Sequence, residues 1–213
     1  MRPFALIILI VALGGMLFWF NRVSKEPTPK TSSDDTVAIQ KQETPKITIL
    51  DPIRGNFDAP ITIIEFADYL CENCKNMSPI VNQVLAAYPN TVRFVWKDFP
   101  IDSLNPNASL ASQAARCAGK QDAYWEYHDL LMSQPMFSMQ PSFGNLADTL
   151  SLNREKFDEC LELKTTAPIV KKDLEEAIAL QLDGTPYFFI NNKPFSPSSF
   201  EDFTNAINQI PQN

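Results

Sequence analysis

Residues 61–77, ITIIEFADYLCENCKNM, decide the fold of this chain. They open with Ile61 to Phe66, a run of strand length that is rich in β-branched residues. From Cys74 to Tyr88 apolar residues recur every three or four positions, which predicts a helix. A second β-rich run, TVRFVW, follows at residues 91–96. The pattern therefore predicts a β-α-β unit, in which the two strands are parallel.

Two cysteines, in the motif Cys71-Glu72-Asn73-Cys74, lie between the first strand and the helix. The unpaired N–H groups at a helix N-terminus stabilise an anion there, so the first thiol is expected to have a lowered pKa. We therefore predict that Cys71 is a redox nucleophile. Cys74 comes one helical turn later, where it can close a disulfide with Cys71 and resolve a mixed disulfide.

A third strand of similar character, PYFFI, covers residues 186–190 and follows Gly184-Thr185-Pro186. A cis proline at its start could place an open backbone edge beside the cysteines, and such an edge can pair with an extended peptide. Residues 108–182 contain the patterns of several consecutive helices. After the strand we expect a turn at Asn191 and Asn192, then a final helix that begins at Ser198-x-x-Glu201.

The N-terminus carries a membrane-directed segment. Phe4 to Phe20 is an uncharged apolar run of 17 residues between Arg2 and Arg22. As a helix it would span about 25 Å, close to the thickness of a hydrocarbon core. Because the run ends in bulky residues, we expect an uncleaved anchor over residues 1–22, with a cleavable signal as the alternative. Residues 23–46 are rich in Ser, Thr, Pro and mixed charge, which is typical of a flexible linker.

Composition and charge narrow the function. The 213 residues are 45% hydrophobic, so the chain can bury a sizeable core. The formal net charge is -7, and residues 47–213 alone hold 12 Lys and Arg against 21 Asp and Glu. This balance gives no general support for a nucleic-acid partner.

Five stretches taken together resemble a DsbA-like thiol:disulfide oxidoreductase of the thioredoxin superfamily. They are residues 58–60 (DAP), 66–75 (FADYLCENCK), 94–100 (FVWKDFP), 125–131 (WEYHDLL) and 184–190 (GTPYFFI). The resemblance covers residues 47–213. It implies an α/β thioredoxin fold, a central mixed β-sheet flanked by helices, with a helical insertion at about residues 106–182.

The resemblance also implies how the site is built. It places a cis Thr185–Pro186 bond opposite Cys71 and Cys74, as part of the substrate-binding surface, and requires no bound cofactor. Related proteins often carry a second cysteine pair, so Cys117 and Cys160 are interpreted as a structural disulfide, with two buried free thiols as the alternative. We expect no metal, because a four-cysteine zinc site usually has two close pairs. The single histidine, His128, is expected to serve packing or capping rather than catalysis.

Four further residues are candidates for tuning the cysteines. In this fold Asp68 and Lys97 come near the ends of core strands, close to the cysteines, although a solvated charge pair is the alternative. Many relatives carry Pro and His or an aromatic residue between the cysteines, whereas this chain has Glu72 and Asn73. A carboxylate beside the nucleophile opposes thiolate formation, while Asn73 can still donate a hydrogen bond. We therefore expect a weaker oxidant than the strongest family members.

The sequence thus predicts a membrane-tethered, extracytoplasmic dithiol oxidase that acts on reduced, exported proteins. Without the anchor it would be secreted or periplasmic. The resemblance implies a quinone-linked membrane reoxidase as its partner. Two alternatives are a disulfide isomerase or reductase, and a non-catalytic chaperone that holds exported chains beside Pro186.

Overall fold

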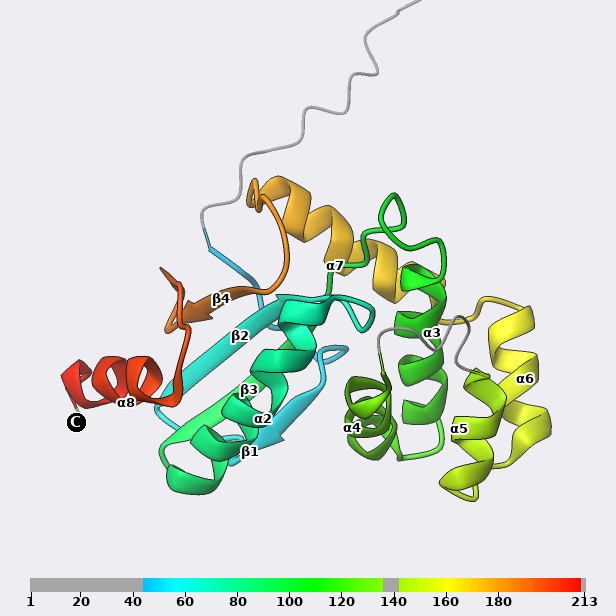
Figure 1. Ribbon diagram of the computed structural model, residues 1–213, viewed down its shortest axis with the longest axis horizontal. Helices are drawn as coiled ribbons and strands as arrows, with labels where there is room; N and C mark the ends of the chain where they lie inside the picture. The colour runs from blue at the N-terminus through cyan, green and yellow to red at the C-terminus, as the bar shows by residue number, and fades with distance from the viewer. Residues whose placement is uncertain (1–43, 136–141, 212–213) are drawn as a thin grey trace, which may run out of the picture. The chain divides into compact units, whose positions relative to one another are not determined.

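The computed structural model describes residues 44–135 and 142–211, and Figure 1 shows their arrangement. One mixed sheet has the strand order β1-β3-β2-β4-β5. Its strands are β1 (Ile53–Gly55), β2 (Ile61–Ala67), β3 (Val92–Asp98), β4 (Tyr187–Ile190) and β5 (Lys193–Phe195). The helices are α2 (Glu72–Ala87), α3 (Ala108–Gly119), α4 (Tyr124–Ser133), α5 (Phe143–Thr149), α6 (Arg154–Glu162), α7 (Ala167–Ala179) and α8 (Phe200–Gln209).

The predicted β-α-β unit forms the centre of this sheet. Strands β2 and β3 are parallel over their full length, with Ile61 opposite Val92 and Ala67 opposite Asp98. Every residue of β2 is buried, as expected for a strand that is covered on both faces. Helix α2 connects the two strands, so its N-terminus lies just beyond the end of β2 that carries the cysteine motif.

Three antiparallel pairings complete the sheet. Strand β4 pairs with β2, and β5 pairs with β4 through the predicted turn at Asn191 and Asn192. Both turn residues have a positive φ, which asparagine tolerates and which matches the twist of a tight hairpin. The short strand β1 pairs with β3 at the opposite edge. Neither β1 nor β5 was predicted.

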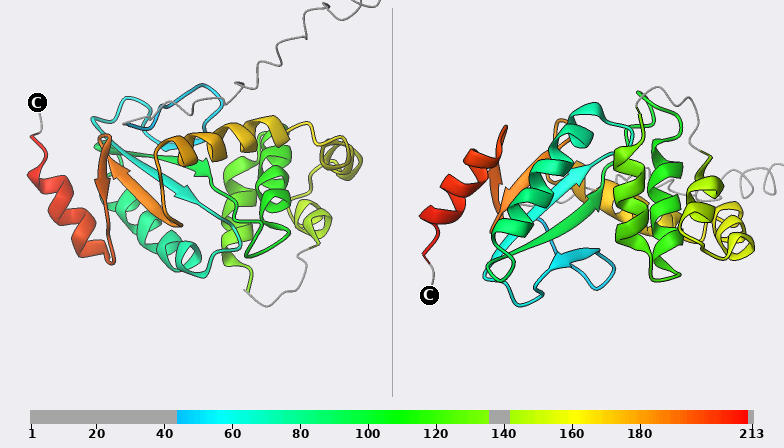
Figure 2. Two further views of the ribbon diagram at one scale, coloured as in Figure 1. Left: turned by 90° about the horizontal axis from the view of Figure 1, so that it is seen from above. Right: turned by 60° about the horizontal axis from the view of Figure 1, so that its bottom comes forward.

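Two hydrophobic clusters lie on opposite faces of the sheet. The larger one packs α2 and α8, through residues such as Val84 and Phe203, against inward side chains including Ile63 and Trp96. The smaller one packs α7, through Ala177, against the alternate side chains of the same strands. Figure 2 shows α2 and α7 on the two sides of the sheet. Because successive side chains of a strand point to opposite faces of the sheet, neighbouring residues of one strand join different clusters.

The expected helical insertion runs from α3 to α7 and lies beside the sheet. Within it Cys117 of α3 and Cys160 of α6 are joined in a disulfide, with 5.8 Å between their Cα atoms. Helix α3 is buried along most of its length and packs against α4 and α6. The disulfide therefore links the central helix of the insertion to an outer one.

The last helix begins one residue later than predicted. Ser199, rather than Ser198, is its N-cap, and Asp202, rather than Glu201, completes the capping box. The Asp202 carboxylate accepts hydrogen bonds from the backbone N–H groups of Ser198 and Ser199. Both serines offer a hydroxyl. The helix begins at Ser199 because the carboxylate of Asp202, three residues later, folds back onto the Ser199 backbone N–H.

The predicted anchor and nearly all of the predicted linker lie outside the described residues. Among residues 44–135 and 142–211, no helix is both long enough and apolar enough to span a bilayer.

Candidate active site

Cys71 is the N-cap residue of α2, where the chain turns from β2 into the helix. Its sulfur accepts a hydrogen bond from the backbone N–H of Cys74, with 3.2 Å between nitrogen and sulfur. Cys71 is half-buried, whereas Cys74 is fully buried, and both are free thiols. The more accessible sulfur therefore sits at the positive end of the helix, and the other lies behind it.

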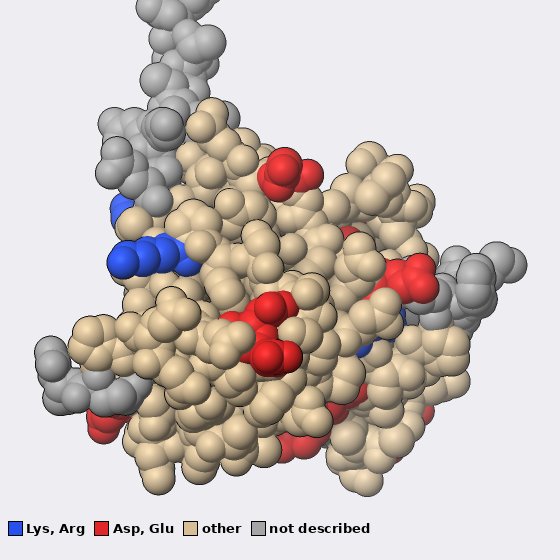
Figure 3. Space-filling view, turned by 60° about the vertical axis from the view of Figure 1, so that its left-hand side comes forward, with Lys and Arg blue, Asp and Glu red and all other residues tan. Residues whose placement is uncertain are grey.

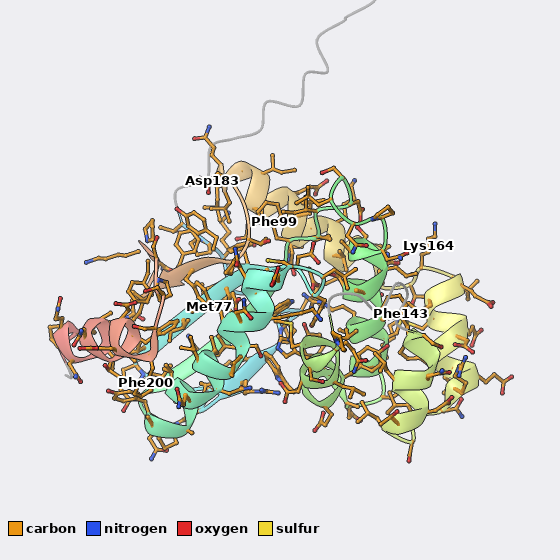
Figure 4. The ribbon with its side chains drawn as sticks, viewed as in Figure 1. Met77, Phe99, Phe143, Lys164, Asp183 and Phe200 are labelled. Atoms are coloured by element: carbon orange, nitrogen blue, oxygen red, sulfur yellow. A yellow bond between two sulfur atoms is a disulfide. The ribbon has the colours of Figure 1, made fainter. Side chains whose placement is uncertain are left out.

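The loop before β4 faces this cysteine pair. The Thr185–Pro186 peptide bond is cis, and the Cys71 Sγ lies 3.5 Å from the Thr185 carbonyl oxygen. Next to it is a groove of about 440 Å³ between α2 and the β4–β5 hairpin. Its lining includes Asn73, Met77, Pro186 and Phe195, and no charged side chain contributes to it. Figure 4 shows Met77 on the part of α2 that borders this groove.

The two thiols have opposite pKa shifts. A hydrogen bond from the Cys74 thiol lowers the pKa of Cys71 to about 6. Burial opposes this shift, and a hydrogen bond from Thr185 adds to it. Burial, followed by the hydrogen bond to Cys71 and the charge of Glu65, raises the pKa of Cys74 far above its usual range. At neutral pH the pair therefore holds one thiolate on Cys71 and a proton on Cys74.

Glu65 is a functional candidate that the sequence analysis missed. It lies in β2, is 1% exposed, and faces the same side of the sheet as Ile63 and Ala67, beneath α2. Burial, and then the charge of Cys71, raise the pKa of its carboxyl well above the ordinary value. Its Oε1 atom has no hydrogen-bond partner among the described residues. The signal was an acidic residue inside an otherwise apolar strand, ITIIEFA.

Asp68 lies near the cysteines, as predicted. Its carboxylate accepts hydrogen bonds from the backbone N–H groups of Leu70 and Ile101, and so fixes the turn that leads to Cys71. Burial raises the pKa of Asp68 despite these bonds. Its charge in turn raises the pKa of Cys71, opposing the hydrogen bonds.

A second missed neighbour is Lys75, whose ammonium interacts electrostatically with both cysteines and donates to the Leu131 and Gln134 carbonyl oxygens.

Lys97 does not lie beside the cysteines, contrary to the prediction. Trp96 and Lys97 are consecutive residues of β3, so their side chains point to opposite faces of the sheet. Trp96 and Cys74 belong to the same hydrophobic cluster, so Lys97 lies on the face away from Cys74. There its ammonium lies 2.9 Å from Asp51, 3.5 Å from Asp173 and 2.9 Å from Glu176. It is fully buried, so the alternative of a solvated charge pair is also wrong.

The two residues between the cysteines are exposed on the first turn of α2. Asn73 borders the groove together with Pro186. The acidic group that chiefly raises the pKa of Cys71 is Asp68, not Glu72. The tuning role of Glu72 and Asn73 stays a prediction.

His128 has the packing role that its surroundings predict. It is buried between Trp96 and Trp125, with ring centroids 4.6 and 5.0 Å away. Its Nδ1 shares a hydrogen bond with the Tyr69 hydroxyl at 3.0 Å. Among the residues that the structure describes, no cluster of three or more His, Cys, Asp and Glu side chains is arranged to hold a metal ion.

Comparison with known proteins places this architecture in a family. The sequence model described as thioredoxin matches residues 48–209. The crystal structure of oxidised BdbD from Bacillus subtilis aligns with a TM-score of 0.70 and 26% identity, over 78% of this chain and 95% of that one. A thioredoxin-like oxidoreductase from Silicibacter pomeroyi gives 0.66 and 26%, over 76% and 92%. Wolbachia pipientis α-DsbA1, at 21% identity and a TM-score of 0.65, shares the fold over 76% and 92%.

The chain also matches a segment of much longer curated proteins. The Na(+)/H(+) antiporter NhaA 3 of Salinispora tropica is 34% identical over 158 residues, which are 74% of this chain and 24% of the antiporter. NhaA 1 of Salinispora arenicola is 34% identical over 67% of this chain and 22% of its own length. The chain thus spans about a quarter of these relatives, and the match assigns no transport activity to it.

Proposed function

Since the chain belongs to the thioredoxin family and is a DsbA-like thiol–disulfide oxidoreductase, we propose that it introduces disulfide bonds into exported proteins through Cys71 and Cys74. The observation that supports this proposal most directly is the opposite pKa shift of the two thiols. A thiolate at Cys71 is a good leaving group at neutral pH. The reduced pair is thereby stabilised, which favours transfer of the disulfide to a substrate.

The proposed reaction starts from the Cys71–Cys74 disulfide. A substrate thiolate attacks Cys71 Sγ, the S–S bond breaks, and its electron pair passes to Cys74, which takes up a proton. Glu65, whose carboxyl pKa is raised by burial and whose charge acts on Cys74, is the proposed acid for this step. A second substrate thiolate then attacks the substrate sulfur of the mixed disulfide. The products are an oxidised substrate and the Cys71 thiolate.

The groove beside Pro186 is the proposed substrate site. An extended chain can pair with the backbone there, while the uncharged lining imposes no charge requirement. The surrounding surface in Figure 3, on the side toward β4, β5 and α8, is mainly uncharged, with acidic side chains near its centre. These features suit reduced, unfolded polypeptides of varied sequence.

We further propose that residues 1–22 anchor the chain in a membrane and that the domain lies on the extracytoplasmic side, where disulfides persist. After each turnover Cys71 and Cys74 are reduced and must be reoxidised. The proposed oxidant is a quinone-linked membrane enzyme. If the anchor is cleaved, the same domain would act as a secreted or periplasmic protein.

Oxidation of reduced, unfolded ribonuclease A tests the catalytic proposal. The full-length oxidised chain is expected to restore ribonuclease activity at least about tenfold faster than the Cys71→Ser variant, which lacks the nucleophile. The Cys74→Ser variant cannot form the Cys71–Cys74 disulfide and should therefore also fail to oxidise ribonuclease. Equal rates for wild type and Cys71→Ser would contradict the oxidase and favour a peptide-binding chaperone.

Scrambled ribonuclease distinguishes the isomerase alternative. An oxidase transfers its disulfide and needs an oxidant for each turnover, whereas an isomerase acts from the reduced state. We expect the reduced chain to reactivate scrambled ribonuclease no faster than the Cys71→Ser variant. Faster reactivation would assign the chain to the isomerases and overturn the oxidase proposal.

A further inference from the structure

The Cys117–Cys160 disulfide lies at the floor of an open cleft on the helical insertion. Both cysteines line this cleft, which has a volume of about 340 Å³ and is here named the disulfide cleft. Its other lining residues are Lys120, Gln121, Lys156, Glu159, Leu163 and Thr165. Cys160 is 7% exposed and Cys117 is 1% exposed. Cys160 is therefore the more accessible of the two cysteines from this cleft, which is large enough for a small molecule.

The polar groups around Cys160 are arranged to hold a thiolate. The Thr165 Oγ1 lies 3.1 Å from Cys160 Sγ, and it accepts a hydrogen bond from the Lys120 ammonium at 2.7 Å. A disulfide sulfur carries no hydrogen, so only the threonine hydroxyl can donate in this contact, and the Cys160 carbonyl oxygen, at 3.4 Å, is its second acceptor. When the sulfur becomes an anion, this hydrogen bond becomes charge-assisted and strengthens. Lys120 polarises the hydroxyl further in the same direction.

This arrangement offsets an unfavourable feature of the site. Cys160 is in the last turn of α6, where the negative end of the helix dipole opposes an anion. Lys120, which donates to the Thr165 hydroxyl, and Lys156, in the lining of the same cleft, supply positive charge that opposes this effect. Cys117, by contrast, lies 3.7 Å from Thr166 Oγ1, whose hydroxyl donates to the Gln113 carbonyl oxygen, and is more deeply buried.

We propose that Cys117 and Cys160 form a second redox site, which exchanges disulfides with small anionic thiols, that is, low-molecular-weight thiols that bear carboxylates. The thiol enters the disulfide cleft with its carboxylate toward Lys120 and Lys156. Glu159 lies in the same lining and disfavours more highly charged anions. This site is independent of the proposed function at Cys71 and Cys74, because it uses another face and another class of substrate.

The exchange balances in two steps. A thiolate RS⁻ attacks Cys160 Sγ, the S–S bond breaks, and Cys117 leaves as a thiolate that takes a proton from water. A second RS⁻ then attacks the sulfur of the bound R group. RSSR is released, and Cys160 remains as a thiolate next to Thr165. The net change is oxidation of two small thiols and reduction of one protein disulfide.

The test uses the full-length chain with Cys71→Ser and Cys74→Ser, so that only the second pair can react. Its two thiols are counted after exposure to 3-mercaptopropionate, which is anionic, or to cysteamine, which is cationic, at equal thiolate concentrations. Far-UV circular dichroism follows the fold throughout. We expect reduction of the folded chain, about fivefold faster with the anionic thiol, as for an exposed ion pair.

Substitutions then identify the residues. Replacing both lysines, Lys120→Gln with Lys156→Gln, should abolish the preference for the anionic thiol. Lys171→Gln is the matched control, because Lys171 is an exposed lysine on α7 that pairs with Glu175. Thr165→Val should lower the equilibrium constant for reduction by glutathione about tenfold, while Thr165→Ser should retain it within about twofold.

Several outcomes would overturn the proposal. Thiols that stay unreactive until the circular dichroism signal is lost would show that the disulfide is closed to exchange in the folded chain. Equal rates with both probes, or a charge preference that survives the lysine substitutions, would refute recognition in the cleft. An unchanged equilibrium constant in Thr165→Val would remove the role of the hydroxyl. None of these results would bear on Cys71 and Cys74, whose function is measured with ribonuclease.

Discussion

The pair of thiols in the active site shows how three residues of separation produce opposite chemistry. Cys71 is at the helix N-cap, half-buried, and receives hydrogen bonds that favour its charged form. Cys74 is inside the first turn, fully buried, and faces the acidic Glu65. The pKa values of the two thiols therefore shift in opposite directions, because Cys71 receives hydrogen bonds from donors and Cys74 is desolvated beside the acidic side chain of Glu65.

The pKa of Cys71 gives a direct prediction. In the reduced chain the absorbance of the thiolate at 240 nm should rise with pH and reach its midpoint near the expected pKa of about 6. Below this midpoint Cys71 is protonated, so its rate of alkylation should fall as the pH decreases. The Cys71→Ser variant is the control and should lose this transition. A midpoint above about 8, near that of an ordinary thiol, would contradict the assigned environment.

This midpoint also bears on oxidising strength. A pKa of about 6 lies between the values of about 7 for thioredoxin and about 3.5 for DsbA. A less acidic nucleophile stabilises the reduced pair less, so we expect a reduction potential below that of DsbA, about -120 mV. Equilibration with glutathione measures this potential.

The acidic residue that opposes thiolate formation at Cys71 is chiefly Asp68. Asp68→Asn should therefore raise the reduction potential, whereas Glu72→Gln should change it less.

Glu65 gives a prediction about stability and pH. Its folded pKa is raised above the unfolded value, so the folded state keeps a proton that the unfolded state loses. The free energy of unfolding should therefore decrease as the pH rises from the unfolded pKa, near 4.5, through the higher folded pKa. Glu65→Gln removes this loss. Urea unfolding at pH 8 should show the variant to be more stable than the wild type.

The same comparison at low pH is the control. At pH 4 the wild-type carboxyl is protonated in both states, so the difference between wild type and Glu65→Gln should become small. A difference that does not depend on pH would mean that the carboxyl has the same pKa in the folded and the unfolded protein.

At the scale of elements, sequence patterns were sufficient where one segment determines its own structure. The apolar strand β2, the strand β3 and the periodic helix α2 were predicted within a few residues, as was the turn at Asn191 and Asn192. Strands β1 and β5 have three residues each, and only their pairing with β3 and β4 makes them strands. No local pattern of that length can identify them.

The site divides in the same way. The cysteine motif and the proline loop are local signals, and the structure brings them together. Lys97 was misplaced because its position near a strand end was considered without the alternation of side chains, which puts it on the other face from Trp96. Glu65 was missed because it was counted as part of an apolar strand, although its burial is what gives it a function.

Lys97 therefore has a structural role that can be measured. It joins β3 to α7 through Asp173 and Glu176, and to the segment before β1 through Asp51. Lys97→Met would leave these carboxylates without their shared cation, at a cost of about 3–5 kcal/mol in the free energy of unfolding. The pKa of Cys71 should not change. Lys193→Met, at an exposed position on β5, is the matched control and should have little effect.

At the scale of the whole described domain, the sheet and the insertion depend on each other through buried charges as well as apolar contacts. Arg116 of α3 donates to Asp98 at the end of β3 and to Asp173 of α7, at 2.7 and 2.6 Å. Burial, and then the charge of Asp98, raise the pKa of Asp173 to about 7. This network therefore connects the end of β3, on the side of the sheet where the active site lies, to the centre of the insertion.

The disulfide of the insertion is a covalent link within this arrangement. Cys117 and Cys160 are 43 residues apart, and restricting such a loop in the unfolded chain contributes about 4 kcal/mol in the chain-entropy treatment. The double variant Cys117→Ala with Cys160→Ala should lower the free energy of urea unfolding by up to this amount. Both cysteines are replaced so that no unpaired thiol remains. Because the cross-link acts mainly on the unfolded state, reduction of the wild-type disulfide before unfolding should lower the free energy similarly. A loss in the variant but none on reduction would instead attribute the cost to the two missing side chains.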